Sequence, residues 1–160
     1  MKPDQPNFDP IAKPYRWLEY LTLGRTLQRC RTHFLPLLLD SKQALILGDG
    51  DGRFTATLLA TNPTIQVVAI DTSATMLQLL RQRCEAANTA TRLTTHHTSA
   101  LTFPLEASSQ TDLVVTHFFL DCLTQPDLET LIARTTKHLR PGSLWLLSDF
   151  RIPSGGPMRL

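Results

Sequence analysis

Three glycines at every second position follow a short apolar run in the first half of the chain. Residues 44–47 read Ala-Leu-Ile-Leu, and Gly48, Gly50 and Gly52 come directly after them in the sequence Gly-Asp-Gly-Asp-Gly. Glycine adopts positive φ angles without a steric penalty and has no Cβ atom to keep the backbone away from a ligand. The pattern predicts a buried strand that ends in a tight turn facing a ligand, with a helix over residues 54–60 beyond it.

A second apolar run, residues 67–70, ends in a carboxylate, Asp71, which lies 19 residues after Gly52. The succession of strand, glycine turn, helix, strand and acid is how parallel sheets hold a cofactor that carries a nucleoside, and the acid accepts hydrogen bonds from ribose hydroxyls. The same alternation continues along the chain, so we expect an α/β fold: a Rossmann-like, doubly wound sheet of about five parallel strands with N-terminal helices. The predicted strands lie near 43–47, 65–70, 93–97, 112–116 and 143–148, and the predicted helices near 11–23, 25–35, 53–61, 73–87 and 125–139.

The spacing of the glycines discriminates between cofactors. A dinucleotide fingerprint, G-x-G-x-x-G, requires a third glycine at position 53 or 55, where the chain has Arg53 and Thr55. A phosphate-binding P-loop requires Gly-Lys-Ser/Thr, whereas Gly52 is followed by Arg53 and Phe54. Neither a dinucleotide site nor a P-loop is predicted.

The G-x-G-x-G pattern resembles motif I of the class I S-adenosylmethionine (SAM)-dependent methyltransferases, and Asp71 resembles the ribose-binding acid of that family. Further resemblance follows in the family's order along the chain, and the first 15 residues resemble the quinone-biosynthesis-like branch. The segments concerned are 98–104, 111–116 (Thr-Asp-Leu-Val-Val-Thr), 139–149 (beginning Leu-Arg-Pro-Gly) and 8–15, which is similar to an "FD..A..Y" pattern.

This resemblance implies that SAM is the cofactor and assigns its contacts. The implied contacts are Tyr15, Gly48, Asp49, Gly50, Asp51, Gly52, Asp71, Thr72, Ser99, Ala100, His117 and Phe118. Two departures stand out: Ile46 occupies the position where the family has an orienting acid, and Ser99 stands where the family often has Asp. Asp49 and Asp51 either face the positive charges of the cofactor or are turn-forming acids exposed to water.

Three of these residues have alternative interpretations. His117, at the end of the fourth predicted strand, is the candidate catalytic base because imidazole titrates near neutral pH. Alternatively, it is a wall of the cofactor pocket or a hydrogen-bonding structural residue. Phe118 contacts a ligand or belongs to the core. Tyr15 leads an N-terminal lid over the cofactor, or packs its helix onto the sheet.

Bulk properties exclude several classes of protein. A net charge of +2 provides no basic surface for nucleic acid. The cysteines, Cys30, Cys84 and Cys122, form no C-x-x-C pair, so neither a disulfide framework nor a metal site is predicted, and a cytoplasmic setting is the simplest interpretation. No signal peptide or membrane-spanning segment is predicted.

We expect three regions: an N-terminal helical segment or lid over residues 1–42, a SAM-binding core over 43–150, and a loop or truncated tail over 151–160. Members of the resembled family continue with further strands after the fifth. Their lack here predicts that the chain is a fragment, or that the exposed edge of the fifth strand is covered in a homo-oligomer.

The predicted function is transfer of a methyl group from SAM to a small molecule, quinone-like or lipid-like by the N-terminal resemblance. The alternatives are a non-catalytic SAM-binding or regulatory protein, which the loss of the acid at Ile46 favours, and an NAD(P)-dependent oxidoreductase, which the glycine spacing opposes.

Overall fold

The computed structural model describes residues 24–105 and 110–149 of the chain. The described residues form the strands β1 (Gln43–Leu47), β2 (Gln66–Asp71), β3 (Leu93–His97), β4 (Leu113–His117) and β5 (Leu144–Ser148). The α-helices are α2 (Gly24–Thr32), α3 (Arg53–Thr61), α4 (Ala74–Ala86) and α5 (Gln125–His138), and the 3-10 turns are η2 (Leu35–Leu38), η3 (Ala90–Arg92) and η5 (Leu120–Cys122). All five strands, and helices α3 to α5, begin and end within one residue of their predicted positions.

The five strands form a single parallel sheet in the order β3-β2-β1-β4-β5, which confirms the predicted fold class. From β1 the chain adds β2 and β3 on one side and then returns to place β4 on the other side of β1. In an open parallel sheet, ligands bind beyond the carboxyl ends of the strands at such a reversal. The topology therefore places a site between the ends of β1 and β4.

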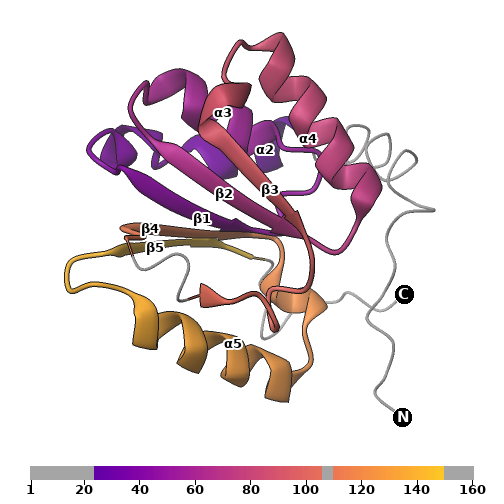
Figure 1. The fold of residues 1–160 in the computed structure, drawn as a ribbon, viewed down its shortest axis with the longest axis vertical. Coiled ribbons are helices and arrows are strands. Elements are labelled where there is room, and N and C mark those ends of the chain that lie inside the picture. The colour runs from indigo at the N-terminus through magenta and orange to yellow at the C-terminus, as the bar shows by residue number, and fades with distance from the viewer. Residues whose placement is uncertain (1–23, 106–109, 150–160) are drawn as a thin grey trace, which may run out of the picture.

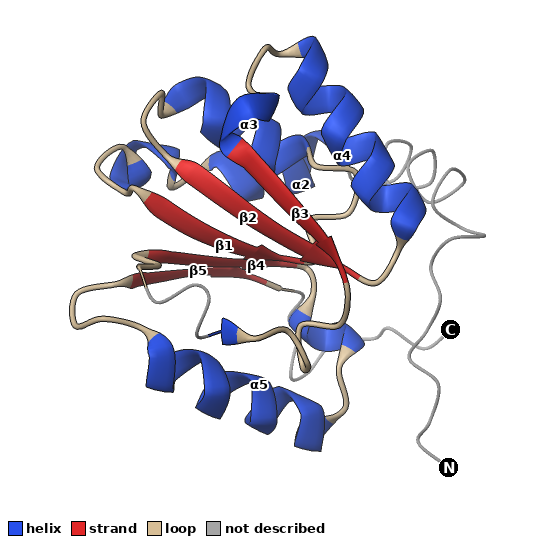
Figure 2. Ribbon diagram, in the orientation of Figure 1, coloured by secondary structure: helices blue, strands red, loops and turns tan. Residues whose placement is uncertain are grey.

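Helices cover both faces of the sheet (Figure 1, Figure 2): α2, α3 and α4 lie on one face and α5 on the other. Side chains alternate between the two resulting cores, so that Ile46 and Val115 pack toward α3 while Leu45 and Val114 pack toward α5. Because β1 and β4 are buried on both faces, residues 44–47 and 113–115 are continuous apolar runs.

Asp112 fastens the amino end of the sheet. Its carboxylate accepts hydrogen bonds from the backbone N–H groups of Lys42 (2.8 Å) and Gln43 (3.1 Å). The acid immediately before β4 thus holds the start of β1 beside it, at the edge opposite the ligand site.

Helix α2 is shorter than predicted. It ends at Thr32, and the chain continues as the turn η2, whereas the sequence predicted one helix over 25–35. Pro36 accounts for the difference, because a helix that continued through residue 35 would need the N–H of residue 36 to bond the Thr32 carbonyl oxygen, and proline has no N–H. The predicted helix over 11–23 lies outside the described residues.

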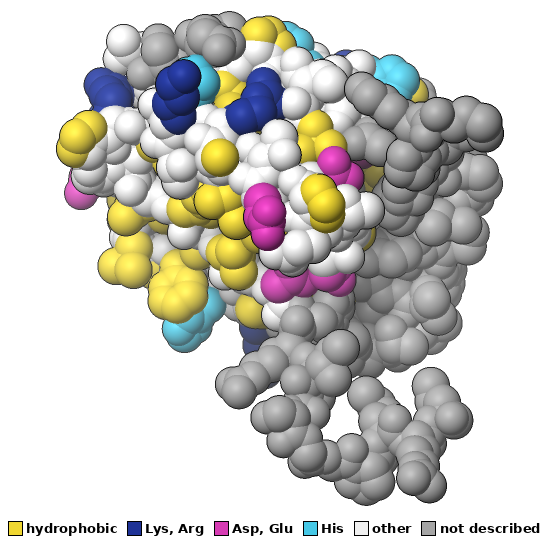
Figure 3. Space-filling view, turned by 90° about the horizontal axis from the view of Figure 1, so that it is seen from below, with side chains coloured by type: hydrophobic (Ala, Val, Ile, Leu, Met, Phe, Trp, Pro, Cys, Tyr) yellow, Lys and Arg dark blue, Asp and Glu magenta, His cyan; other side chains and the backbone are white. Residues whose placement is uncertain are grey.

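Strand β5 forms one edge of the described sheet and carries exposed apolar side chains. Leu144 and Leu147 are 45% and 51% exposed, and Ile132 of α5 is also exposed. Figure 3 shows the molecule from the α5 side, where hydrophobic side chains gather on the surface. None of the described helices has the length and apolar character needed to cross a lipid bilayer.

Candidate functional site

The loop after β1 contains the three glycines in positive-φ conformations: Gly48 at 69°, Gly50 at 59° and Gly52 at 78°. Two of them are also packed too closely for a side chain. A Cβ atom on Gly48 would lie 2.3 Å from Phe119, and one on Gly52 would lie 2.7 Å from the Cα atom of Leu80 in α4. A Cβ atom on Gly50 would have only the sulfur of Met76 within reach, at 4.0 Å. Glycine at positions 48 and 52 thus allows Phe119 and Leu80 to pack against the loop backbone, while Gly50 has open space beside it.

Asp49 caps helix α3 from within the glycine loop. Its Oδ2 atom accepts hydrogen bonds from the backbone N–H (2.9 Å) and the hydroxyl (2.6 Å) of Thr55. Its Oδ1 atom is buried and has no hydrogen-bond partner among the described residues. Burial raises the pKa of this carboxyl from 3.8 to about 6, against the opposing effects of Thr55 and of the Arg31 guanidinium.

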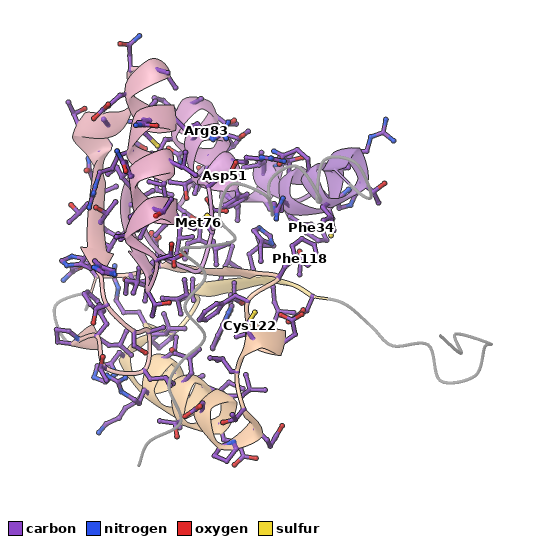
Figure 4. The ribbon with its side chains drawn as sticks, turned by 90° about the vertical axis from the view of Figure 1, so that its right-hand side faces the viewer. Phe34, Asp51, Met76, Arg83, Phe118 and Cys122 are labelled. Atoms are coloured by element: carbon purple, nitrogen blue, oxygen red, sulfur yellow. The ribbon has the colours of Figure 1, made fainter. Side chains whose placement is uncertain are left out.

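Asp51, two residues further on, turns toward α4. Its Oδ2 atom pairs with Arg83 Nη2 (2.8 Å) and with Arg53 Nε (3.1 Å), and Arg83 Nε also donates to the Asp51 carbonyl oxygen (3.1 Å). Figure 4 shows Asp51 and Arg83 beside each other. The Asp51 carboxylate therefore fastens the loop to α4 and is already paired with two cations.

Asp71 ends β2 beside the glycine loop, as predicted. Its Oδ1 atom accepts a hydrogen bond from the backbone N–H of Ser73 (2.9 Å), which starts α4. The next residue, Thr72, is exposed, and its carbonyl oxygen lies 2.9 Å from Nε2 of His97. Because β1 and β2 are hydrogen-bonded neighbours, Asp71 and the glycine loop share the same edge of the sheet.

The loop after β3 carries Ser99 and Ala100 and is held from the opposite helix layer. Arg134 of α5 donates to the carbonyl oxygens of Ala100 (3.4 Å), Leu101 and Phe103 (2.8 Å). The Ser99 hydroxyl is directed at its own loop, where it accepts from the Leu101 N–H (3.2 Å). Sequence reasoning did not identify Arg134, whose partners lie more than 30 residues away in the chain.

His117 ends β4 on the other side of β1 and is 3% exposed. Its ring packs edge-on against Phe54, with 4.6 Å between ring centroids, and neither ring nitrogen has a hydrogen-bond partner among the described residues. Burial, together with the positive charge of Arg31, lowers the pKa of His117 from 6.5 to about 4. The imidazole is therefore neutral at pH 7.

Phe118 has a left-handed backbone conformation, with φ of 54°, directly after His117. Its N–H donates to the Ser148 carbonyl oxygen (2.7 Å), which fixes this turn against β5. The guanidinium carbon of Arg31 lies 5.1 Å from the centroid of the Phe118 ring, a cation–π distance. Phe118 lies between α2 and the sheet in Figure 4.

Arg31 is a candidate site residue that sequence reasoning missed. It is only 8% exposed, although arginine is rarely buried without a role. The sequence held one signal: Arg31 lies four residues after Leu27 and four before Leu35, and so falls on the apolar stripe of the helix predicted over 25–35. A charge in that position indicates a buried partner or ligand.

Cys122 lies at the same end of the sheet, and its chemistry is that of a thiol. Partial burial and the negative charge of Asp121 raise its pKa to about 11, with Asp149 and Asp71 contributing. A thiol with this pKa is protonated at pH 7 and is a weak nucleophile.

The described residues contain no group of three or more His, Cys, Asp or Glu side chains that could hold a metal ion.

The structure thus brings together the predicted residues from β1, β2, β3 and β4 at one edge of the sheet. Tyr15, the predicted lid residue, lies outside the described part of the chain. The arrangement offers a glycine-lined turn, a carboxylate on the adjacent strand and a buried polar group on the opposite strand. Such an edge can hold an extended ligand with a nucleoside at one end.

Comparison with known proteins places this geometry in context. A profile of the family described as "Methyltransferase domain" matches residues 44–142, more than half of the chain. No curated protein sequence matches the chain.

Solved methyltransferase structures share the fold. The N-methyltransferase NodS from Bradyrhizobium japonicum, in complex with S-adenosylhomocysteine (SAH), is 23% identical with a TM-score of 0.63, over 79% of this chain and 70% of NodS. The mitomycin 7-O-methyltransferase MmcR is 16% identical with a TM-score of 0.67, over 93% of this chain and 45% of MmcR. A SAM-dependent methyltransferase from Geobacter sulfurreducens, in complex with SAH, is 21% identical with a TM-score of 0.58, over 72% of this chain and 45% of the Geobacter enzyme.

The chain is short relative to many of these structures. It covers between 38% and 49% of five O-methyltransferase structures that match it. At identities below 25%, these similarities establish a common fold.

Proposed function

The chain belongs to the methyltransferase domain family, and on that premise we propose that it binds SAM and transfers its methyl group to a small-molecule acceptor. One observation carries the proposal: the glycine loop after β1 and Asp71 at the end of β2 lie side by side, across β1 from the end of β4. This arrangement supports a nucleoside site beside the reversal of strand order.

The residues present fit such a cofactor. The open space beside Gly50 leaves the loop backbone free to approach a ligand, and the Asp71 carboxylate is positioned to accept hydrogen bonds from ribose hydroxyls. The loop of Ser99 and Ala100, held by Arg134, would lie against the adenine, with Thr72 at its rim. Phe118 would border the reacting end.

SAM, when bound, supplies an electrophilic methyl group on a sulfonium, and methyl transfer is an in-line displacement. The contribution of this chain would be alignment of the acceptor with the methyl carbon and exclusion of water. His117 and Phe118, at the β4 end, are the described residues best placed to border the acceptor.

His117 is either a general base or a wall of the cofactor pocket. It is neutral at pH 7 and so able to accept a proton, but a pKa of about 4 makes it a weak base toward a hydroxyl group. Its near-complete burial favours the pocket interpretation. His117→Ala separates the two: a base loses turnover with little change in cofactor affinity, whereas a pocket wall loses affinity.

A small acceptor is favoured over nucleic acid, because a net charge of +2 gives no basic stripe. The quinone-like character of the acceptor rests on the N-terminal resemblance alone.

The free thiols of Cys30, Cys84 and Cys122 agree with a cytoplasmic setting. We also propose that the exposed β5 edge pairs with another copy of the chain, which light scattering of the purified protein would test.

Calorimetric titration with SAM, SAH and NADH tests the proposed function. Micromolar binding of the two adenosyl compounds without binding of NADH is the expected result, and an acceptor screen would then follow. SAM binding without turnover of any acceptor would instead support a regulatory protein, and NADH binding alone would support an oxidoreductase.

A further inference from the structure

The loop after β3 begins directly beside Asp71. Asp71 and His97 are paired across β2 and β3, and the N–H of Thr98 donates to the Asp71 carbonyl oxygen (3.1 Å). The strand order β3-β2-β1 puts this loop on the far side of Asp71 from the glycine loop. A nucleoside with its ribose on Asp71, and with its remainder along the glycine loop, would therefore turn its base toward residues 98–103.

The polar backbone groups of this loop are sorted by direction. The N–H groups of Thr102 (3.1 Å) and Phe103 (3.0 Å) both donate to the carbonyl oxygen of Ser99. The carbonyl oxygens of Ala100, Leu101 and Phe103 instead converge on a single guanidinium group. Converging carbonyl oxygens carry like partial charges and repel one another, so this loop conformation depends on a cation at the point of convergence.

Arg134 supplies that cation from α5, toward which the chain descends after β3 (Figure 1). Its Nη1 atom donates to the carbonyl oxygens of Ala100 (3.4 Å) and Leu101, and its Nη2 atom donates to that of Phe103 (2.8 Å). Leu131, three residues earlier in α5, is fully buried in the core cluster that also contains Ala100 and Phe103. This packing fixes α5 against the loop, and the rigid fork of arginine can bond several oxygens at once.

The other parts of the proposed cofactor site are held by other contacts. Asp71 accepts from the Ser73 N–H (2.9 Å), and Asp51 pairs with Arg83 (2.8 Å) to fasten the glycine loop to α4. These contacts involve α4, which lies on the face of the sheet opposite to α5. Loss of the Arg134 guanidinium should therefore disturb the base end of the site and spare the ribose end.

We propose that Arg134 is a positioning residue for recognition of the adenine: it fixes the loop after β3 in the conformation that selects the base of SAM. Arg134 acts through the loop backbone, from the side of the loop that packs on α5. The inference rests on the proposed function and adds to it a residue that determines which base the cofactor carries.

Two probes isolate the contribution of the base. SAH carries the adenine, whereas S-ribosylhomocysteine has the same sugar and amino acid without it. Calorimetry of the full chain measures the dissociation constant of SAH, and competition with SAH measures that of S-ribosylhomocysteine. Arg134→Met should reduce the preference for SAH about tenfold and leave the affinity for S-ribosylhomocysteine within about twofold. A variant that is merely unstable lowers both affinities by the same folded fraction, so the preference is unaffected.

Lys137→Met, an exposed position three residues later in α5, is the matched control and should keep the wild-type preference. Arg134→Lys keeps the charge without the fork and should retain part of the preference. An unchanged preference in Arg134→Met, or a wild type that binds both compounds equally, would overturn the positioning role and leave the proposed function intact. Failure of the wild type to bind SAH would overturn both.

Discussion

Phe119 lies against Gly48, so closely that a Cβ atom on the glycine would be 2.3 Å from Cδ2 of the ring. Gly48 follows β1 and Phe119 follows β4, the two strands on either side of the reversal in strand order. The contact holds the floor of the candidate site together, because it fixes the glycine loop relative to the β4 end. Glycine is required here for packing as well as for its φ angle.

Gly48→Ala should therefore destabilise the chain more than Gly142→Ala. Both glycines have positive φ, 69° and 87°, so both variants carry backbone strain, but a Cβ on Gly142 meets no atom within 4 Å. We expect an additional loss of about 1–3 kcal/mol for Gly48→Ala, measured by urea unfolding. Adding Phe119→Leu should restore part of it. Equal losses at the two glycines would show that the loop adapts to the clash.

Asp71→Ala should weaken the binding of SAH by about 1–3 kcal/mol, because the ribose hydroxyls would lose a charged acceptor. Calorimetry measures the change. Asp40→Ala, an exposed acid before β1 at the opposite edge of the sheet, serves as the control and should bind normally. Unchanged affinity in Asp71→Ala would remove this residue from the site.

His117 should make the protein sensitive to acid. Its folded pKa of about 4 lies below the ordinary 6.5, so the unfolded chain takes up the proton first as the pH falls. Its contribution to stability is fully present above pH 6.5 and is lost as the pH falls toward 4, amounting to about 3 kcal/mol. Denaturant unfolding of His117→Phe at several pH values should show a smaller loss over that range. If the unfolding free energy of His117→Phe changes with pH in the same way as that of the wild type does, the lowered pKa of His117 is contradicted.

Asp49 should change the stability of the protein with pH in the direction opposite to His117. Its folded pKa of about 6 lies above 3.8, so its contribution is fully present below pH 4 and is lost as the pH rises through 6. In the wild type, the pH dependence of stability that arises from Asp49 partly cancels the pH dependence that arises from His117. Asp49→Asn should therefore lose more stability than the wild type when the pH is lowered from 6 to 4. Besides burial, the groups that act on the Asp49 carboxyl are Thr55, Arg31 and Asp51.

Arg134→Met should loosen the loop after β3. Arg134 is bonded to three carbonyl oxygens of that loop, and its loss would leave them without their donor. Hydrogen exchange of residues 99–105 should accelerate, and stability should fall by about 1–3 kcal/mol. Lys137→Met, an exposed residue near the end of the same helix, is the control. Unaltered exchange in the loop would show that Arg134 does not hold it.

The sequence predicted the elements because their signals are local. Apolar runs bounded by glycine, together with the helical stripe of residues 125–139, specify backbone conformation over a few residues each, and all five strands were found within one residue of their predictions. Asp71 was predicted at the tip of its strand for the same reason. Among the described helices only α2 was predicted too long, because Pro36 has no N–H to bond the carbonyl oxygen of Thr32, four residues earlier.

The roles of charged residues depended on partners far away in the chain. Asp49 and Asp51 look alike in the sequence, yet Asp51 pairs with Arg83, 32 residues away, while Asp49 bonds Thr55 of α3 and has a buried Oδ1 atom. Likewise, burial of His117 depends on Phe54, and burial of Arg31 on packing of α2. Local pattern therefore determined the fold and the cofactor class, whereas tertiary packing decided which polar groups are desolvated, since desolvation depends on every element that surrounds a group.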